Sequence, residues 1–208
     1  MGEPLVDFLD VMRRLRAQCP WKAEQTHRSL ARYLLEETHE TIEAIDTGDP
    51  DHLREELGDL LLQVYFHAVI AEEAGDFTLD DVARGITEKM LRRNPHVFAP
   101  GGADEGAAAP QDAPQDAAAV NDAWQAIKAT EKAREHVTDG LPPTLPALLY
   151  ADKVLDRLGR EGAAPDLTAP PPEADLGDRL LGLVAEARAA DRDPEQALRD
   201  AVRRLLSR

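Results

Sequence analysis

The chain has 208 residues and a formal net charge of −16, which allows one medium domain or two small ones and disfavours binding to duplex nucleic acid or an anionic membrane. A single cysteine, Cys19, excludes an internal disulfide framework. No apolar run is long enough to span a bilayer, and the N-terminal residues lack the apolar core of a secretory signal. We therefore expect a cytoplasmic protein. Because only 4% of the residues are aromatic, the core must be mostly aliphatic, which favours packed helices over a sheet.

Helices are predicted from Leu5 to about Asn94, where apolar residues recur at helical spacing in four segments. Glycine or proline ends each segment, at Cys19-Pro20, Gly48-Asp49-Pro50, Gly75 and Asn94-Pro95. Candidate N-caps precede the last three segments: Thr26, Asp49 or Asp51, and Thr78. Short connections between these helices predict an all-α fold with an antiparallel four-helix bundle.

The composition changes after this bundle. Residues 99–118 read APGGADEGAAAPQDAPQDAA, which is too poor in large apolar residues to form a packed core, so we expect a flexible linker. Residues 119–208 are again helical in pattern, with a short helix around Trp124, another from about Leu145 to Leu158, and two more after a proline-rich break at 163–172. The chain is therefore divided into a helical domain at 1–98, a linker at 99–118 and a helical C-terminal region at 119–208.

A short internal repeat connects the two helical parts. Glu56-Leu57-Gly58-Asp59 resembles Asp175-Leu176-Gly177-Asp178, and each is followed by a leucine-rich segment. A shortened duplication of the first unit is one explanation. Chance similarity between two leucine-rich helices is the other, and the sequence leaves both open.

Acidic residues form two sets that point to a metal site. Glu36, Glu37 and Glu40 lie within about one turn of the second predicted helix, and Glu56 and Asp59 are three residues apart on the third. Residues at these spacings project to one side of a helix. Two antiparallel helices would bring the sets together as an all-oxygen site, which suits Mg²⁺ or Mn²⁺. The alternative is a solvated acidic face.

A di-iron carboxylate site is an alternative interpretation of these acidic residues. Such bundles carry two Glu-x-x-His motifs, and Glu36 with His39 provides one of them. The second acidic set ends in Asp59, where a histidine would be required. The di-iron reading is therefore disfavoured.

Basic and aromatic residues supply candidate contacts for a phosphorylated ligand. Lys89, Arg92 and Arg93 end the fourth predicted helix, where they either complement the helix dipole or bind phosphate oxygens. Trp124 and Lys128 follow on the next predicted helix, and Lys128 is either solvated or folded back over the site. Trp21 either stacks on a base or fixes its loop to the core.

Several longer segments together carry a resemblance to a known family. They are CPW at 19–21, EQTH at 24–27, YLLEETHE at 33–40, LREELGDLLLQVYFHA at 53–68 and DDVARGITEKMLRRNPHVF at 80–98. In this order and spacing the chain resembles the MazG family of nucleoside triphosphate pyrophosphohydrolases, within the all-α NTP pyrophosphatase superfamily. The segments WQAIK at 124–128 and LPALL at 145–149 are similar to the stretch that joins two MazG repeats.

The resemblance implies Mg²⁺-dependent hydrolysis of a nucleoside triphosphate to a monophosphate and pyrophosphate, with Mn²⁺ as a possible substitute. It places metal ligation on the EExxE and ExxD motifs, here Glu37, Glu40, Glu56 and Asp59, and leaves Glu36 to orient or deprotonate water. Lys89, Arg92 and Arg93 match basic positions implied to hold phosphates during catalysis. The expected substrate-binding residues are Trp21, Lys22, Lys89, Arg93, Trp124 and Lys128. The family also implies a homodimer with sites built partly across the interface.

The chain departs from the family pattern at three places. Lys22 stands where the family usually has Asp, and Asn94 replaces the first His of RRHPHVF. No EExxE helix precedes Asp175, so we expect the C-terminal region to be a degenerate, catalytically inactive unit.

Three functional hypotheses follow from these observations. The first is a nucleoside triphosphate pyrophosphohydrolase of broad base specificity that acts in nucleotide housekeeping. The second is a narrower dUTP, dCTP or phosphoribosyl-ATP pyrophosphatase. The third is a non-catalytic helical bundle that binds a partner, which exposed and widely separated carboxylates would favour.

Overall fold

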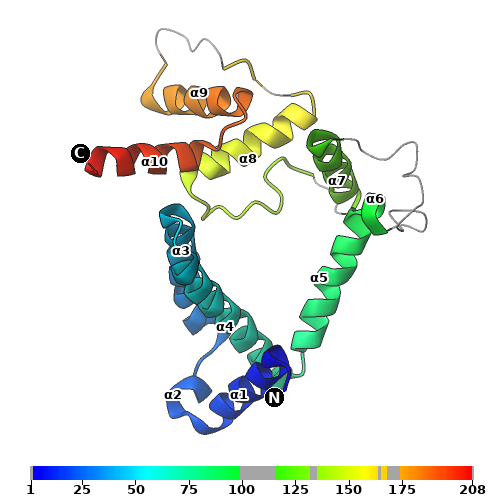
Figure 1. The fold of residues 1–208 in the computed structure, drawn as a ribbon. Coiled ribbons are helices and arrows are strands. Elements are labelled where there is room, and N and C mark those ends of the chain that lie inside the picture. Colours follow the sequence, from blue (N-terminus) through cyan, green and yellow to red (C-terminus); the bar gives the residue numbers. More distant parts are fainter. Residues whose placement is uncertain (1, 99–115, 132–134, 164, 168–173, 208) are drawn as a thin grey trace. The chain divides into compact units, whose positions relative to one another are not determined.

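The computed structural model describes residues 2–98, 116–131, 135–163, 165–167 and 174–207 (Figure 1). These residues form ten α-helices and no strand, which confirms the all-α prediction. The helices are α1 (Pro4–Gln18), α2 (Pro20–Ala23), α3 (His27–Thr47), α4 (Pro50–Ala74), α5 (Leu79–Arg93), α6 (Pro95–Phe98), α7 (Ala117–Glu131), α8 (Ala147–Arg160), α9 (Leu176–Ala189) and α10 (Pro194–Leu206). The predicted linker at 99–118 lies almost wholly outside the described residues.

The chain divides into two compact units, Met1–Ile127 and Lys128–Arg208. The first unit contains α1 to α6 and most of α7, and with them every predicted site residue except Lys128. The second unit begins at Lys128, near the end of α7, and contains α8, α9 and α10. The predicted limits of the functional domains stay a prediction.

Local sequence signals set the ends of the helices in the first unit. The side chains of Thr26, Asp49 and Thr78 accept hydrogen bonds from backbone N–H groups in the first turns of α3, α4 and α5. Gly48 and Gly75 end α3 and α4 with φ of 72° and 77°, a left-handed conformation that glycine adopts without a steric penalty. These residues confirm the predicted helix starts and stops. Helix α2 was not predicted, and it begins at Pro20, where proline is favourable in the first turn.

Helix α4 is central to the first unit, because it contacts α1, α3 and α5. A short turn joins α3 to α4, and the two helices pack along each other (Figure 1). The buried core comes from α1, α3 and α4 and contains Met12, Leu30, Tyr65, Phe66 and Val69. This packing makes the α3–α4 pair a firm support for side chains that lie between the two helices.

Polar contacts fix α1 against the C-terminal half of α4. The Tyr65 hydroxyl donates to the Leu5 carbonyl oxygen at 3.0 Å, and Arg13 donates to both carboxylate oxygens of Glu72 at 2.8 and 3.1 Å. Arg16 binds Glu73 and also donates to backbone carbonyls around α2, among them Gln25 at 3.0 Å. Arg16 thereby ties the segment between α1 and α3 to α4.

Helix α5 contacts α4 and α6 but does not pack on α3. Apolar side chains remain exposed along α4 and α5, namely Leu57, Leu61, Val64, Val82, Ile86 and Met90. The contacts within one chain therefore leave apolar surface on both helices, and the closed four-helix bundle stays a prediction.

In the second unit, α8, α9 and α10 pack against one another around Leu155 and Val184. Arg188 of α9 binds Asp152 and Asp156 of α8 at 2.7 and 3.1 Å. None of the described helices is both long enough and apolar enough to cross a membrane.

The two members of the internal repeat differ in structure. Glu56 and Asp59 lie inside α4, whereas Asp175 and Asp178 form a capping box at the start of α9. In that box the two side chains accept hydrogen bonds from each other's backbone N–H groups, at 3.3 and 2.9 Å. The carboxylates of Asp175 and Asp178 are therefore used to begin a helix.

Candidate metal and phosphate site

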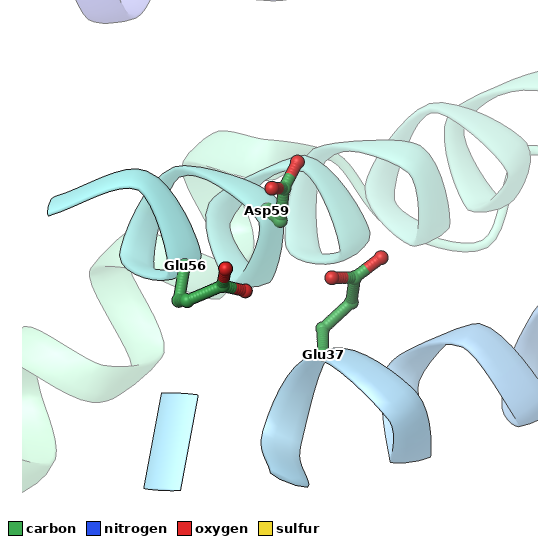
Figure 2. Close-up of side chains that lie close together, drawn as sticks. All are labelled: Glu37, Glu56 and Asp59. Atoms are coloured by element: carbon green, nitrogen blue, oxygen red, sulfur yellow. The ribbon is translucent and has the colours of Figure 1, made fainter. Parts of the chain in front are cut away.

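Three of the predicted carboxylates meet between α3 and α4. One carboxylate oxygen from each of Glu37, Glu56 and Asp59 lies within 4.8 Å of the others. Glu37 comes from α3, and it faces Glu56 and Asp59 from α4 (Figure 2). The three-residue spacing of Glu56 and Asp59 puts both on the side of α4 that faces α3. The structure thus brings together two acidic sets that are far apart in sequence.

The electrostatics of this cluster are unfavourable without a cation. Partial burial, the negative charges of Asp59, Glu40 and Glu56, and a hydrogen bond with Glu40 together raise the pKa of the Glu37 carboxyl above its ordinary value. The effect of Glu40 shows that this fourth predicted ligand lies near Glu37, although Glu40 itself is exposed. A divalent cation would offset the repulsion within this group.

Neighbouring polar groups hold the cluster in place. The Thr41 hydroxyl is buried, donates to the Glu37 carbonyl oxygen at 2.8 Å and lies 3.5 Å from the Glu56 carbonyl oxygen, so it bridges the backbones of α3 and α4. His52 Nε2 lies 3.3 Å from a carboxylate oxygen of Glu56, whose side chain is only 12% exposed. Gln63 Nε2 donates to Glu37 Oε1 at 3.5 Å. None of these three residues was predicted from the sequence, although Gln63 lies four residues after Asp59 and hence on the same helix face.

The donor set suits a hard divalent cation. Glu37, Glu56 and Asp59 offer carboxylate oxygens only, the ligands preferred by Mg²⁺ and Mn²⁺. His39, which the di-iron reading requires, is exposed and is not part of the cluster. The residues present therefore fit Mg²⁺ and do not fit a di-iron centre.

Cation binding is expected to strengthen as the pH rises. The folded, metal-free protein holds the Glu37 proton more tightly than the unfolded chain, because the folded-state pKa is raised. The contribution of Glu37 to the free energy of unfolding is therefore present at low pH and lost as the pH rises through the raised pKa. Mg²⁺ needs the ionised carboxylate, so its affinity should increase over the same range with release of a proton.

Calorimetric titration with Mg²⁺ in buffers of different ionisation enthalpy measures both the affinity and the released proton. Glu37→Gln should weaken binding and remove the proton release. An affinity of the wild-type protein that does not change with pH would contradict this prediction.

Glu36 is exposed on α3 and is not one of the three clustered carboxylates. It precedes Glu37 directly, so it lies beside the cluster without being turned to the same face. Its role with water stays a prediction.

The predicted cations lie at the end of α5. Lys89, Arg92 and Arg93 occupy the last turn or so of this helix, and the guanidinium carbon of Arg93 lies 4.8 Å from the ring centroid of Trp124 on α7. This contact joins two residues of the predicted substrate-binding set. Because α5 packs on α4 and not on α3, contacts within one chain do not place α5 against the helix of Glu37. Lys128 lies one turn after Trp124 on α7 and is partly buried.

Trp21 and Lys22 lie beside the core of the first unit. Trp21 makes an edge contact with Tyr33 of α3 at 6.1 Å between ring centroids, yet 49% of Trp21 is exposed. Lys22 Nζ lies 5.4 Å from the Trp21 ring centroid and 5.2 Å from that of Phe66 on α4. Helix α2 is thus held to the core, as one interpretation of Trp21 predicted, while about half of Trp21 remains exposed. Lys22, which stands where the family usually has Asp, is partly engaged with aromatic rings.

Comparison with known proteins identifies the family. Residues 25–98 match the MazG nucleotide pyrophosphohydrolase domain, a segment that includes all three clustered carboxylates and the α5 cations. An uncharacterised 26.1 kDa protein of Streptomyces cacaoi is 42% identical over 205 residues, which is 96% of this chain and 78% of that protein.

Two further relatives carry functional names. The nucleoside triphosphate pyrophosphohydrolase/pyrophosphatase MazG of Thermotoga maritima is 37% identical over 225 residues, covering 97% of this chain and 82% of that protein. The nucleoside triphosphate pyrophosphohydrolase of Mycobacterium tuberculosis is 43% identical over 209 residues, and this chain spans 57% of its length. Similarity over nearly the whole chain, together with the matched domain and the carboxylate cluster within it, shows that this protein belongs to the MazG family of nucleotide pyrophosphohydrolases.

Proposed function

We propose that this protein hydrolyses nucleoside triphosphates to nucleoside monophosphates and pyrophosphate in a Mg²⁺-dependent reaction of broad base specificity. The observation that carries the proposal is the Glu37–Glu56–Asp59 cluster, whose oxygens lie within 4.8 Å of one another across two helices. The names of relatives in Thermotoga maritima and Mycobacterium tuberculosis support the same reaction. Nucleotide housekeeping in the cytoplasm is the expected setting.

The carboxylates have two roles, metal ligation and the orientation of water. Glu37, Glu56 and Asp59, with Glu40 as a fourth ligand, would hold the Mg²⁺ ion. When bound, Mg²⁺ offsets the charge of the triphosphate and of the transition state. Glu36 orients the attacking water or accepts its proton, because it adjoins the ligands without being one of them. The bond that breaks is the anhydride between the α and β phosphates, and one water molecule is consumed.

The cations and aromatic side chains bind the rest of the substrate. Lys89, Arg92 and Arg93 neutralise phosphate oxygens that the metal does not contact, through charge-assisted hydrogen bonds. Arg93 is held against Trp124, which presents its guanidinium in a defined orientation. Trp21 and Lys22, with Trp124 and Lys128, are proposed to contact the nucleoside or the distal phosphates.

Product analysis tests this function directly. The protein is incubated with each nucleoside triphosphate and deoxynucleoside triphosphate in the presence of Mg²⁺, and the products are separated by anion-exchange chromatography. We expect the monophosphate and pyrophosphate from several bases, and no turnover after chelation with EDTA. A diphosphate with inorganic phosphate, or no turnover at all, would overturn the proposal. Turnover restricted to dUTP, dCTP or phosphoribosyl-ATP would instead support the narrower alternative.

The geometry disfavours the non-catalytic alternative. Exposed and widely separated carboxylates would favour the non-catalytic hypothesis, whereas Glu37, Glu56 and Asp59 are partly buried and close together. A solvated face gains nothing from placing three like charges together.

We propose that two copies associate through the exposed apolar side chains of α4 and α5, which completes a four-helix bundle and lets the α5 cations of one copy approach the carboxylates of the other. Leu57 and Leu61 on α4 and Ile86 and Met90 on α5 are each at least 36% exposed, more apolar surface along two adjoining helices than a monomer usually shows.

Light scattering after size exclusion should give the mass of a dimer. Ile86→Glu should shift the protein to a monomer, whereas the neighbouring change Thr87→Glu on the same exposed helix should not. A monomeric wild-type protein at working concentration would contradict the dimer.

The C-terminal unit is proposed to be a catalytically inactive, shortened relative of the first unit. Asp175 and Asp178 support this view, since both carboxylates accept hydrogen bonds at the start of α9. The residues that would be needed to bind a cation there are thus already used in helix capping.

A further inference from the structure

Two buried polar atoms on α4 have no hydrogen-bond partner among the described residues, namely Gln63 Oε1 and His67 Nε2. Gln63 is only 4% exposed. A buried polar atom without a partner destabilises the folded state, so two such atoms in one core helix require a physical reason. Neither residue belongs to the carboxylate cluster.

Both residues continue the row of side chains that forms the cluster. Glu56, Asp59, Gln63 and His67 follow one another at intervals of three, four and four residues on α4. These spacings place all four on one helix face. A partly buried polar row therefore extends from the carboxylates along α4.

Gln63 connects this row to a proposed metal ligand. Its Nε2 donates to Glu37 Oε1 at 3.5 Å, across the α3–α4 interface. The amide nitrogen of Gln63 must face Glu37, because an ionised carboxylate only accepts hydrogen bonds. The opposite end of the amide, Oε1, is an acceptor and needs a donor.

His67 lies at the other end of the row. Its Nδ1 lies 2.7 Å from Nδ1 of His27, and the two rings are parallel, with centroids 5.0 Å apart and an interplanar angle of 2°. One of these nitrogens must carry the proton that joins them. Burial, and then the nearby His27, lower the pKa of His67, so its ring is neutral near neutral pH and carries a single N–H.

We propose that Gln63 and His67 are positioning residues that hold Glu37 in place for the divalent cation through a hydrogen-bonded row containing one ordered water. In this row His27 Nδ1–H donates to His67 Nδ1, and His67 Nε2–H donates through the water to Gln63 Oε1. Gln63 Nε2–H then donates to Glu37 Oε1. The inference rests on the metal site of the proposed function.

Two physical arguments support this arrangement. Side chains four residues apart on a helix have Cβ atoms about 5–6 Å apart, a separation that one water between an amide and an imidazole can bridge, and buried waters usually satisfy such otherwise unpaired groups. In the proposed arrangement every donor points toward the carboxylates, so successive hydrogen bonds would polarise one another in the same direction. The row thereby fixes the His67 tautomer as Nε2–H.

Residues that orient a metal ligand typically contribute about 10–100-fold to metal affinity. Gln63→Met keeps the length of the side chain and removes both hydrogen-bonding atoms, so it should raise the Kd for Mn²⁺ about 10–100-fold. His67→Leu should weaken binding less, because it acts through Gln63. His67→Gln retains a donor near the position of Nε2 and should restore affinity toward that of the wild-type protein.

The experiment combines Mn²⁺ titration by electron paramagnetic resonance with nitrogen-15 NMR of the histidine rings. Leu62→Met is the matched control, since Leu62 adjoins Gln63 in the sequence but lies off the polar row and only packs against the core. Circular dichroism confirms that each variant keeps its helices. The NMR measurement uses the wild-type, metal-free protein, and it should show His67 protonated at Nε2 and unprotonated at Nδ1.

Failure of the inference can be distinguished from failure of the proposed function. Absence of Mn²⁺ binding to the wild-type protein overturns the metal site itself. If the wild-type protein binds Mn²⁺ and Gln63→Met binds it equally well, the positioning role is overturned. A His67 ring protonated at Nδ1 overturns the proposed hydrogen-bonded row, whether or not a metal binds. This NMR measurement uses the wild-type protein, so it tests the proposal even if Gln63→Met does not fold.

Discussion

Replacing Asp59 with Asn is expected to reduce Mg²⁺-dependent turnover strongly while it leaves the metal-free fold at least as stable as before. The carboxylate of Asp59 is one of three whose oxygens lie within 4.8 Å of one another. Loss of one charged ligand should remove several kcal/mol of transition-state stabilisation, which corresponds to roughly a 10³-fold lower rate. The stability should not fall, because Asp59 repels Glu37 in the absence of a cation.

Two measurements on Asp59→Asn check these opposite effects. Product formation is followed by chromatography, and the melting temperature is recorded with and without Mg²⁺. Mg²⁺ should raise the melting temperature of the wild-type protein and not that of the variant, since only a binding cation stabilises the folded state. Glu55→Gln is the control, because Glu55 is an exposed acidic residue of the same helix outside the cluster. Full activity of Asp59→Asn would remove this residue from the site.

Removing the positive charges at the end of α5 should reduce activity by weakening the binding of substrate phosphates. Lys89→Met and Arg93→Met each delete a charge proposed to bind phosphate, and a hydrogen bond to a charged group contributes about 1.5–3 kcal/mol. Each variant should therefore lose roughly 10- to 150-fold in kcat/KM. Mg²⁺ affinity without nucleotide should be unchanged, because these residues are not metal ligands.

Steady-state kinetics and Mn²⁺ titration separate the two effects. Arg84→Gln serves as the control, since Arg84 lies on the same helix in an exposed pair with Asp81. If the α5 residues only complement the helix dipole, as the alternative reading holds, both variants should keep their turnover and lose only a few tenths to about 1 kcal/mol of stability. Retained kcat/KM in Lys89→Met and Arg93→Met would favour that reading.

The sequence by itself determined the four long helices between residues 4 and 93, namely α1, α3, α4 and α5. Thr26, Asp49 and Thr78 act through hydrogen bonds within one turn, and Gly48 and Gly75 act through their own backbone conformation. Such signals are local, so they can be read without knowledge of the fold. The all-oxygen character of the candidate metal site could also be predicted from the sequence, because it depends only on which residue types share a helix face.

The tertiary structure decided which of these residues meet. Spacing along α3 does not say whether Glu36, Glu37 or Glu40 faces α4, and packing selects Glu37 for the cluster with Glu56 and Asp59. The structure also places Glu56-Leu57-Gly58-Asp59 inside α4 and Asp175-Leu176-Gly177-Asp178 at the start of α9. Two similar sequence segments thus have different roles. The carboxylates of Glu56 and Asp59 face a neighbouring helix, whereas those of Asp175 and Asp178 cap the helix that they begin.

The contributions of Gln63 and His67 required three-dimensional information for the same reason. Their burial, the contact of Gln63 with Glu37 and the short contact of His67 with His27 all join α3 to α4. The free energy of a polar group depends on whether a partner replaces the water that folding removes. Periodicity determined the helix face on which these side chains lie, whereas only the packing of the two helices decided what each polar atom contacts.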